Sequence, residues 1–106
     1  PRAYDLMIIV DGDEEDATVD DEVGRVEARL NDGDSKLATT DKWGKRKFAY
    51  EIDHKTEGHY VVLEMVTEPR DMAPLERTLR LADEVVRHKL IRLPDHEAAR
   101  RGLIEA

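Results

Sequence analysis

The stretch DKWGKRKFAYEI, residues 41–52, carries the signals that organise the rest of the chain. It holds the chain's single Trp, its single Phe and four of its 17 Lys and Arg residues. Phe48, Tyr50 and Ile52 alternate with less apolar residues, as in a strand with one face in the core and one in solvent. Gly44 interrupts the pattern, where glycine usually marks a bulge or a close backbone approach. The stretch therefore predicts a long strand that bends near its glycine.

Two interpretations of the cations in this stretch stay open. Lys45, Arg46 and Lys47 could belong to a solvated edge strand, where charged side chains discourage pairing with another sheet. They could equally form a rim that contacts phosphates, with Trp43 available for stacking on a base. The stretch alone does not separate a structural role from a binding role.

Composition narrows the class of protein. The chain has 106 residues and no Cys, which suits one domain without disulfides or thiolate metal ligands. No apolar run approaches the length of a membrane span, and the first strand begins almost at once, so we expect neither a membrane segment nor a signal peptide. The formal net charge of −8 argues against nucleic-acid binding driven by overall charge. Cations nevertheless cluster at residues 42–47, so a protein that is acidic overall can still place a basic edge against RNA.

Hydrophobic periodicity predicts six elements followed by a tail. A helical stripe of Val19, Val23, Val26 and Leu30 marks the first helix. The predicted elements are a strand at 4–10, a helix at 14–31 with Gly33 as its cap, a strand at 36–52, a loop at 53–58, a strand at 59–67, a helix at 70–81 and a strand at 85–93.

The order βαββαβ predicts the α+β class with a ferredoxin-like, split βαβ fold. We expect a four-stranded antiparallel sheet with both helices on one face. The first and third strands should be central, because both of their faces carry apolar residues. One domain over residues 1–93 and a polar tail over residues 94–106 complete the predicted organisation.

The second face of this sheet has no predicted element to cover it. Met7, Ile9, Tyr60 and Val62 lie on that face, which is either a partner-binding surface or an ordinary open sheet. The tail is too polar to hold its own structure, so we expect residues 95–106 to be mobile in the isolated chain. We expect Leu103 and Ile104 in this tail to order against a partner.

The sequence offers little for catalysis or metal binding. Residues 11–22 superficially resemble a calcium loop but lack its glycine, so we expect a solvated helix start there. No two His residues have the spacing of metal ligands, and Ser35 has no adjacent base. We therefore expect no enzyme activity, metal or cofactor.

The segment WGKRKFAYEI resembles a signature of the bacterial small-ribosomal-subunit protein six family. Three further segments match that family in order: Arg2–Asp5 its opening, Glu57–Tyr60 its turn into a strand, and Glu84–Arg87 the start of its last strand. The resemblance runs from about Arg2 to Leu93. It implies a non-enzymatic protein of the cytoplasmic ribosome.

The resemblance also implies partners and contact residues. It implies binding to the central domain of small-subunit ribosomal RNA together with small-subunit ribosomal protein eighteen, with no membrane and no small-molecule substrate. The resemblance carries over Arg2, Tyr4, Lys45, Arg46, Lys47 and Arg87 as RNA-binding residues, and the local clusters of cations around Trp43 and in the last strand add Lys42, Trp43, Lys89 and Arg92. The expected partner-binding residues come from the strand and tail patterns and are Met7, Ile9, Tyr60, Val62, Leu103 and Ile104.

Two alternatives come from other classes of protein. The first is a ferredoxin-like regulatory or ligand-binding domain that dimerises through its open sheet face. The second is a small enzyme of acylphosphatase type, which is disfavoured because the acids of residues 11–16 would repel phosphate. Co-sedimentation with small subunits would favour the ribosomal interpretation, and an RNA-free homodimer would favour the regulatory one.

Overall fold

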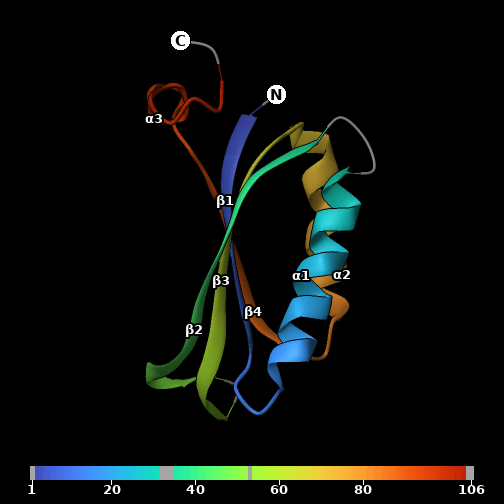
Figure 1. The fold of residues 1–106 in the computed structure, drawn as a ribbon, viewed down its shortest axis with the longest axis vertical. Helices are drawn as coiled ribbons and strands as arrows, with labels where there is room; N and C mark the ends of the chain where they lie inside the picture. The colour runs from blue at the N-terminus through green and yellow to red at the C-terminus, as the bar shows by residue number, and fades with distance from the viewer. Residues whose placement is uncertain (1, 32–34, 53, 105–106) are drawn as a thin grey trace.

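The computed structural model describes residues 2–31, 35–52 and 54–104 (Figure 1). The predicted βαββαβ order is confirmed, with one further helix after the last strand. The elements are β1 (Arg2–Asp11), α1 (Asp16–Asn31), β2 (Lys36–Ile52), β3 (Lys55–Thr67), a 3₁₀ turn (Pro69–Asp71), α2 (Met72–Leu81), β4 (Val85–Arg92) and α3 (Asp95–Arg100). No helix in the described part of the chain is long and apolar enough to cross a membrane.

The sheet has the strand order β2-β3-β1-β4, and each neighbouring pair is antiparallel. This confirms that the first and third strands are central. Leu6 of β1, for example, lies opposite both Leu63 of β3 and Leu90 of β4. Helices α1 and α2 lie together on one side of the sheet, and α3 lies on the other side, at the end where β1 begins (Figure 1).

The core lies between the sheet and the helices α1 and α2. Its central residues, such as Leu6 and Leu63, are fully buried. Burial of each such side chain contributes about 1.5–3 kcal/mol to folding. The predicted stripe of α1 packs into this core. The main cluster comprises Tyr4, Leu6, Ile8, Val10, Val19, Val23, Val26, Leu30, Val61, Leu63, Met65, Met72, Leu75 and Leu79.

Several predicted boundaries differ from the structure, most of them by one or two residues. Helix α1 begins at Asp16 because the preceding residues form a turn, in which the backbone amide of Glu14 donates to the carbonyl of Asp11 at 3.0 Å. Strand β3 begins at Lys55, four residues earlier than expected, since His54 takes a left-handed conformation with φ 63° and tightens the hairpin. The expected cap Gly33 lies outside the described residues.

The prediction that β2 buries Phe48, Tyr50 and Ile52 in the core is wrong. The pairing register of β2 shifts between Lys42 and Gly44, and Gly44 has φ 86°, which confirms the expected bulge. One extra residue reverses which side chains face the helices. Beyond the bulge the aromatic residues of β2 therefore lie on the open face.

The prediction that the tail has no structure of its own is also wrong for residues 95–104. Helix α3 ends in a left-handed Gly102 with φ 75°, and the amide of Leu103 donates to the carbonyl of Ala98 at 2.9 Å, a Schellman cap. Ala98 is fully buried, and Leu103 and Ile104 pack beside it. A few apolar contacts thus order a segment that is polar on average.

Candidate nucleic-acid and protein interface

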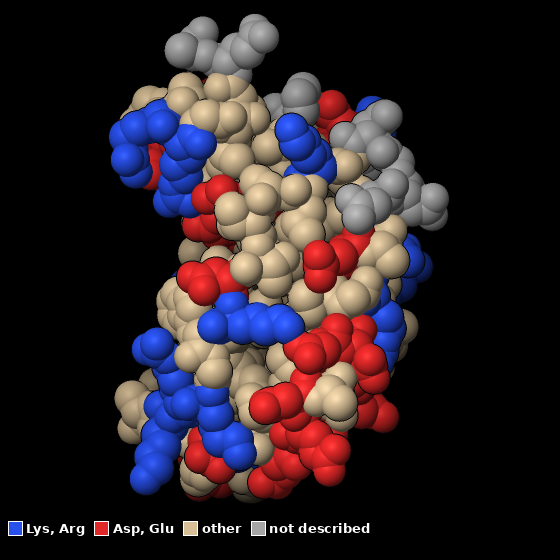
Figure 2. Space-filling model, viewed as in Figure 1, with Lys and Arg blue, Asp and Glu red and all other residues tan. Residues whose placement is uncertain are grey.

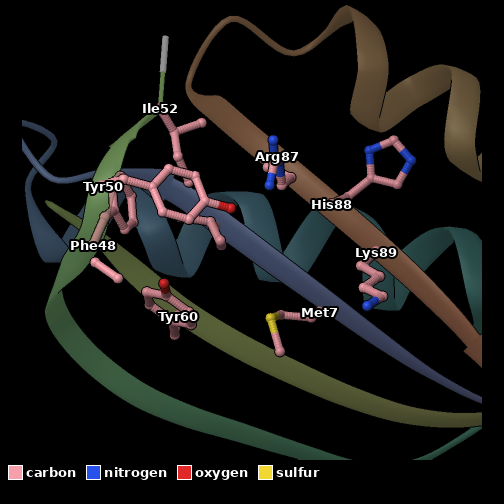
Figure 3. Close-up of a pocket in the computed structure, with 10 residues that line it drawn as sticks. Met7, Phe48, Tyr50, Ile52, Tyr60, Arg87, His88 and Lys89 are labelled. Atoms are coloured by element: carbon pink, nitrogen blue, oxygen red, sulfur yellow. The ribbon is translucent and has the colours of Figure 1, made fainter. Parts of the chain in front are cut away.

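The open sheet face is hollowed at its hairpin end, where β2 and β3 meet. A pocket of about 310 Å³ lies there (Figure 3). Phe48 and Tyr50 of β2 stand on one side of it, and Arg87 and Lys89 of β4 stand across from them (Figure 3). The expectation that no element of this chain covers the face is wrong at the other end, where α3 and the residues after it pack on Ala3 and Val66. The lining residues are Met7, Ile9, Phe48, Ala49, Tyr50, Ile52, Tyr60, Arg87, His88 and Lys89.

Aromatic contacts hold the wall of this pocket. The Trp43 and Tyr60 rings are parallel with centroids 6.1 Å apart, and Phe48 meets Tyr60 edge-on at 6.2 Å. Such pairs contribute about 0.5–1.5 kcal/mol beyond their buried area. Gly58 makes the packing possible, because a Cβ there would lie 2.6 Å from Cγ2 of Ile9 and 2.9 Å from Cζ of Phe48.

Cations that form no ion pair with the described residues lie along one side of the pocket and on the neighbouring edge strand β2. Arg87 lies opposite Ile9, and Lys89 lies opposite Met7, so both side chains share the open face with these residues. Arg87, Lys89 and Lys47 are exposed and form no ion pair with any described residue. Their charge is available to an external anion.

Arg46 is held differently from these cations. Its guanidinium lies 5.2 Å from the centre of the Trp43 ring, a cation–π contact. The Trp43 indole in turn donates from Nε1 to the Asp41 carboxylate at 3.1 Å, and the ring remains 41% exposed. These contacts orient Arg46 without neutralising it.

Three expected RNA-binding cations are paired within the chain. Lys42 forms an ion pair with Asp20 of α1 on the helix side of the sheet. Lys45 lies 3.9 Å from Glu57. Arg92 lies 3.7 Å from Asp95. These three lysine and arginine side chains are less available to phosphate than those around the pocket.

Two expected RNA-binding residues lie away from the pocket. Tyr4 is buried in the main core and is only 6% exposed, so its ring offers no stacking surface. Arg2 is exposed, but it lies opposite Thr67 of β3, at the end of the sheet away from the pocket. The predicted residues therefore do not form one patch.

The expected partner-binding residues divide in the same way. Met7, Tyr60 and Val62 are half-buried near the pocket, and Ile9 is buried there. Leu103 and Ile104 are half-buried at the other end of the face, against this chain's own residues. The sequence analysis missed the aromatic wall at the pocket, although the glycine bulge was a signal that side chains beyond it change face.

Charge is distributed unevenly over the surface. Figure 2 shows Lys and Arg gathered over β2 and its hairpin, and Asp and Glu gathered over the start of α1. Lys55 Nζ lies 2.8 Å from Asp11 Oδ2, and this hydrogen bond lowers the pKa of Asp11. Within the described residues, no three His, Cys, Asp or Glu side chains are grouped so that they could hold a metal ion.

A buried acid lies on the helix side, remote from the pocket. Glu22 of α1 is 1% exposed, and Arg25 donates to it and to Glu84, each at 3.1 Å. Burial, helped by the nearby Glu84 carboxylate, raises the pKa of Glu22 to about 7. The same pairing lowers the pKa of Glu84. This cluster belongs to the packing of the helices on the sheet.

Comparison with known proteins identifies the family. A family model described as ribosomal protein S6 matches residues 3–92. The chain belongs to the ribosomal protein S6 family. It is 41% identical over 91 residues to small ribosomal subunit protein bS6 of Salinispora arenicola, covering 86% of this chain and 95% of that protein. It is 36% identical over 95 residues to bS6 of Streptomyces griseus, covering 90% and 99%.

A solved member of the ribosomal protein S6 family has the same fold. The crystal structure of 30S ribosomal protein S6 from Thermotoga maritima matches with a TM-score of 0.86 at 28% identity, over 95% of each chain. The resemblance seen in the sequence is thus confirmed. Membership makes the chain a structural, non-enzymatic protein of the small ribosomal subunit, associated with ribosomal RNA, and gives the acylphosphatase-type alternative no support.

Proposed function

We propose that this chain binds the central domain of small-subunit ribosomal RNA together with small-subunit ribosomal protein eighteen. The observation that carries the proposal is the hairpin end of the open face, where the unpaired Arg87 and Lys89 line one side of an apolar hollow. Phosphate oxygens supply the negative charge that Arg87 and Lys89 lack within the chain. Apolar contacts with a protein would cover Met7 and Val62, which are only half-buried.

The two partners use different parts of this end. Arg46 and Lys47 lie on the edge strand and reach outward, so they suit the RNA backbone. Tyr60, the member of the aromatic wall that lies next to β1, is nearer the middle of the sheet and suits a protein side chain. Arg2, which is exposed at the far end of the sheet, would make a separate phosphate contact. Specificity for RNA would come from shape, because phosphate contacts carry no sequence information.

Overall charge supports a basic protein partner. The chain carries a formal net charge of −8, although its open face carries exposed cations. A basic protein gains favourable long-range attraction from this acidity, and the phosphates between the two proteins would neutralise the local cations. Binding of both partners together is therefore more favourable electrostatically than binding of RNA alone.

The test compares two double variants with the same change in charge. Arg87→Ala with Lys89→Ala removes the cations at the pocket, whereas Arg77→Ala with Arg80→Ala removes exposed cations on α2. Affinity for a central-domain transcript is measured by filter binding with protein eighteen present, over a salt series. We expect the pocket variant to lose a salt slope of about 1.5, at 0.7–0.9 for each lost phosphate contact.

The control variant should retain both affinity and slope. Equal weakening by the two variants would contradict the proposed surface, because the effect would then come from overall charge. An unchanged pocket variant would contradict it directly. A chain that sediments as an RNA-free homodimer would favour the regulatory-domain alternative.

A further inference from the structure

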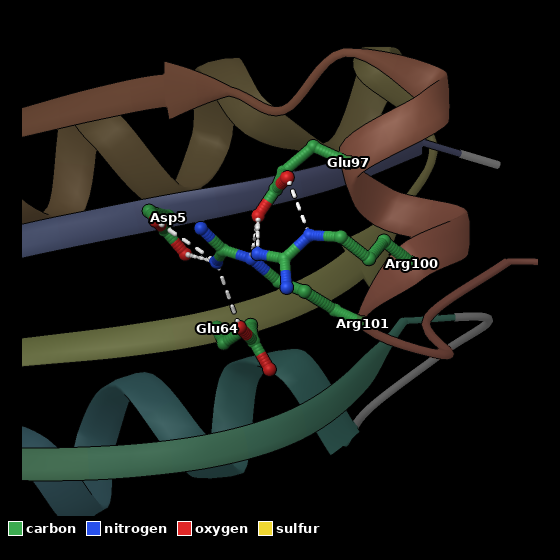
Figure 4. Close-up of polar contacts among 5 residues, drawn as sticks. All are labelled: Asp5, Glu64, Glu97, Arg100 and Arg101. Atoms are coloured by element: carbon green, nitrogen blue, oxygen red, sulfur yellow. Dashed lines mark hydrogen bonds and ion pairs between the residues drawn. The ribbon is translucent and has the colours of Figure 1, made fainter.

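Helix α3 and the residues after it cover the end of the open face opposite the pocket (Figure 4). Arg101 reaches back from this segment to acids on two strands. Its Nη1 lies 2.9 Å from Glu64 Oε2 of β3 and 3.4 Å from both carboxylate oxygens of Asp5 of β1. Its Nε donates to Glu97 of α3 at 2.9 Å. One guanidinium therefore joins the segment to the sheet.

Apolar contacts complete the attachment. Leu103 and Ile104 pack against a small cluster that includes Ala3 of β1 and Val66 of β3. Ala3 is 2% exposed and Ala98 is fully buried, so the contact excludes water locally. The segment is thus held by the Arg101 guanidinium and by the packing of Ala98, Leu103 and Ile104.

The surface beneath this segment is continuous with the rest of the open face. We call Ala3, Asp5, Glu64 and Val66 the acidic shelf. Ala3 lies opposite Val66 and Asp5 lies opposite Glu64, and the next pair on the same face is Met7 with Val62. A protein bound over that next pair would therefore border the shelf.

The sheet is complete without the covering segment. Strand pairing ends at Arg92, with one further backbone hydrogen bond from the Leu93 amide to the Ala3 carbonyl at 2.9 Å, and the family match ends at residue 92. Helix α3 has six residues, which is too short to be stable without its contacts. Exposed ion pairs contribute little individually, so the segment is held weakly enough to exchange.

The shelf needs a cationic occupant. Asp5 and Glu64 are directly opposite each other on neighbouring strands, and like charges in such positions destabilise a sheet. Arg101 offsets this repulsion. If the segment leaves, two facing carboxylates and two apolar side chains remain uncovered. That combination fits a peptide carrying Arg followed closely by aliphatic residues.

We propose that the acidic shelf is a docking site for such a basic peptide segment of the protein partner, and that residues 94–104 occupy it in the free chain. The partner's segment displaces this chain's own segment when the two proteins pair. The inference deepens the proposed function, since it rests on a protein partner at the open face. Its test requires neither RNA nor protein eighteen, so the two proposals can fail separately.

The test measures binding of a labelled probe in the absence of any partner. The probe is a fluorescent peptide with the sequence of residues 94–104, and its binding to the full-length chain is followed by fluorescence anisotropy. Arg101→Glu places a fourth carboxylate beside Asp5, Glu64 and Glu97 and should release the tethered segment. Arg100→Glu is the matched control, because Arg100 contacts only Glu97 among described residues.

We expect the probe to bind Arg101→Glu at least ~10-fold more tightly than the wild type, because a tethered segment competes at a millimolar effective concentration. Arg100→Glu should behave as the wild type does. Adding Asp5→Asn and Glu64→Gln to Arg101→Glu should abolish probe binding. Hydrogen exchange of residues 95–104 reports whether the tethered segment has left the sheet.

Three results would overturn the proposal. The first is continued exchange protection of the segment in Arg101→Glu, which would show that these ion pairs do not hold it. The second is a released segment with no gain in probe binding. The third is equal binding of a probe in which Glu replaces the arginine at position 101.

Discussion

The two ends of the open sheet face are closed by the same chain in different ways. At the tail end, Arg101 satisfies the acids Asp5 and Glu64, and apolar residues fill the contact. At the hairpin end, an aromatic wall leaves a hollow beside the unpaired Arg87 and Lys89. One end is electrostatically complete and the other is not. The difference shows that one sheet face can have an exposed, cationic end and an end covered by the chain itself. The partners that each end finds within the chain decide which it is.

The largest expected effect comes from filling the space at Gly58. A Cβ there would lie 2.6 Å from Ile9 Cγ2 and 2.9 Å from the Val10 carbonyl oxygen, so the backbone must move. We expect Gly58→Ala to destabilise folding by about 3 kcal/mol. Urea denaturation measures the loss, and hydrogen exchange should locate it at the hairpin end.

A matched control for this substitution lies in α1. Nothing lies within 4 Å of a Cβ added at Gly24, so Gly24→Ala should be neutral or stabilising by up to about 1 kcal/mol. Equal stability of the two variants would show that the hairpin end is loosely packed. The comparison of the two ends would then lose its structural basis.

A smaller effect separates the helix side from both ends. The pKa of Glu22 is raised to about 7, so the folded state keeps a proton that the unfolded state loses near pH 4.5. Stability from this group is full at low pH and is lost as pH rises through 7. We expect Glu22→Gln to remove this loss, and to be more stable than the wild type at pH 8 by on the order of 2 kcal/mol.

Denaturation of both proteins between pH 5 and 8 checks this prediction. At the tail end, Arg100 and Arg101 hold the pKa of Glu97 to about 2, so that carboxylate stays ionised throughout this range. Parallel stability curves for the two proteins would rule out Glu22 as the titrating group. If the stability of the wild type falls between pH 5 and 8 and that of Glu22→Gln does not, the pH response comes from Glu22 on the helix side and not from the open face.

A third effect concerns the apolar contact at the tail end. Leu103 is half-buried against the Ala3 cluster, so Leu103→Ala should cost about 1 kcal/mol and raise exchange of residues 95–104. Leu81→Ala serves as the control, because Leu81 is 74% exposed and its removal should change little. Faster exchange at the hairpin end as well would mean that the two ends are coupled.

The smallest effect on stability should come from the edge cations. Arg46→Ala with Lys47→Ala should change folding stability by no more than about 0.5 kcal/mol, yet weaken RNA assembly and flatten its salt dependence. Lys42→Ala with Lys45→Ala should weaken assembly less, because both lysines already face acids. The reverse ranking in a filter-binding salt series would count against the assignment of unpaired cations to RNA.

Local patterns in the sequence were sufficient for the order of elements. The stripe from Val19 to Leu30 identified α1, and two-faced apolar strands identified the centre of the sheet. These signals are periodic and short-range, so neighbouring residues carry them. The glycine of the bulge at Gly44 is also visible in the sequence, but the direction of the side chains after it depends on the pairing register with β3. A shift of one residue moves every later side chain to the other face, and this placed Phe48 and Tyr50 on the open side.

The closure of the tail end could not be predicted from the sequence. Arg101 lies 96 positions from Asp5 and 37 from Glu64, and no local pattern links residues at such distances. Nor did the polar composition after Pro94 show that Ala98 would be fully buried. Tertiary placement brought these groups together. For the same reason Lys42 and Lys45 could not be distinguished in advance from the free cations beside them.

The central position of β1 has a consequence for the order in which the chain is made. Leu6 is synthesised before both of its neighbours, because Leu63 and Leu90 come from strands further along the chain. Pairing between segments so distant in sequence is slow compared with local contacts. A nascent chain stopped before β4 leaves one edge of β1 unpaired, and unpaired edges invite aggregation and proteolysis. Synthesis through Arg92 therefore allows β4 to pair with this edge of β1, which protects the edge from aggregation and proteolysis.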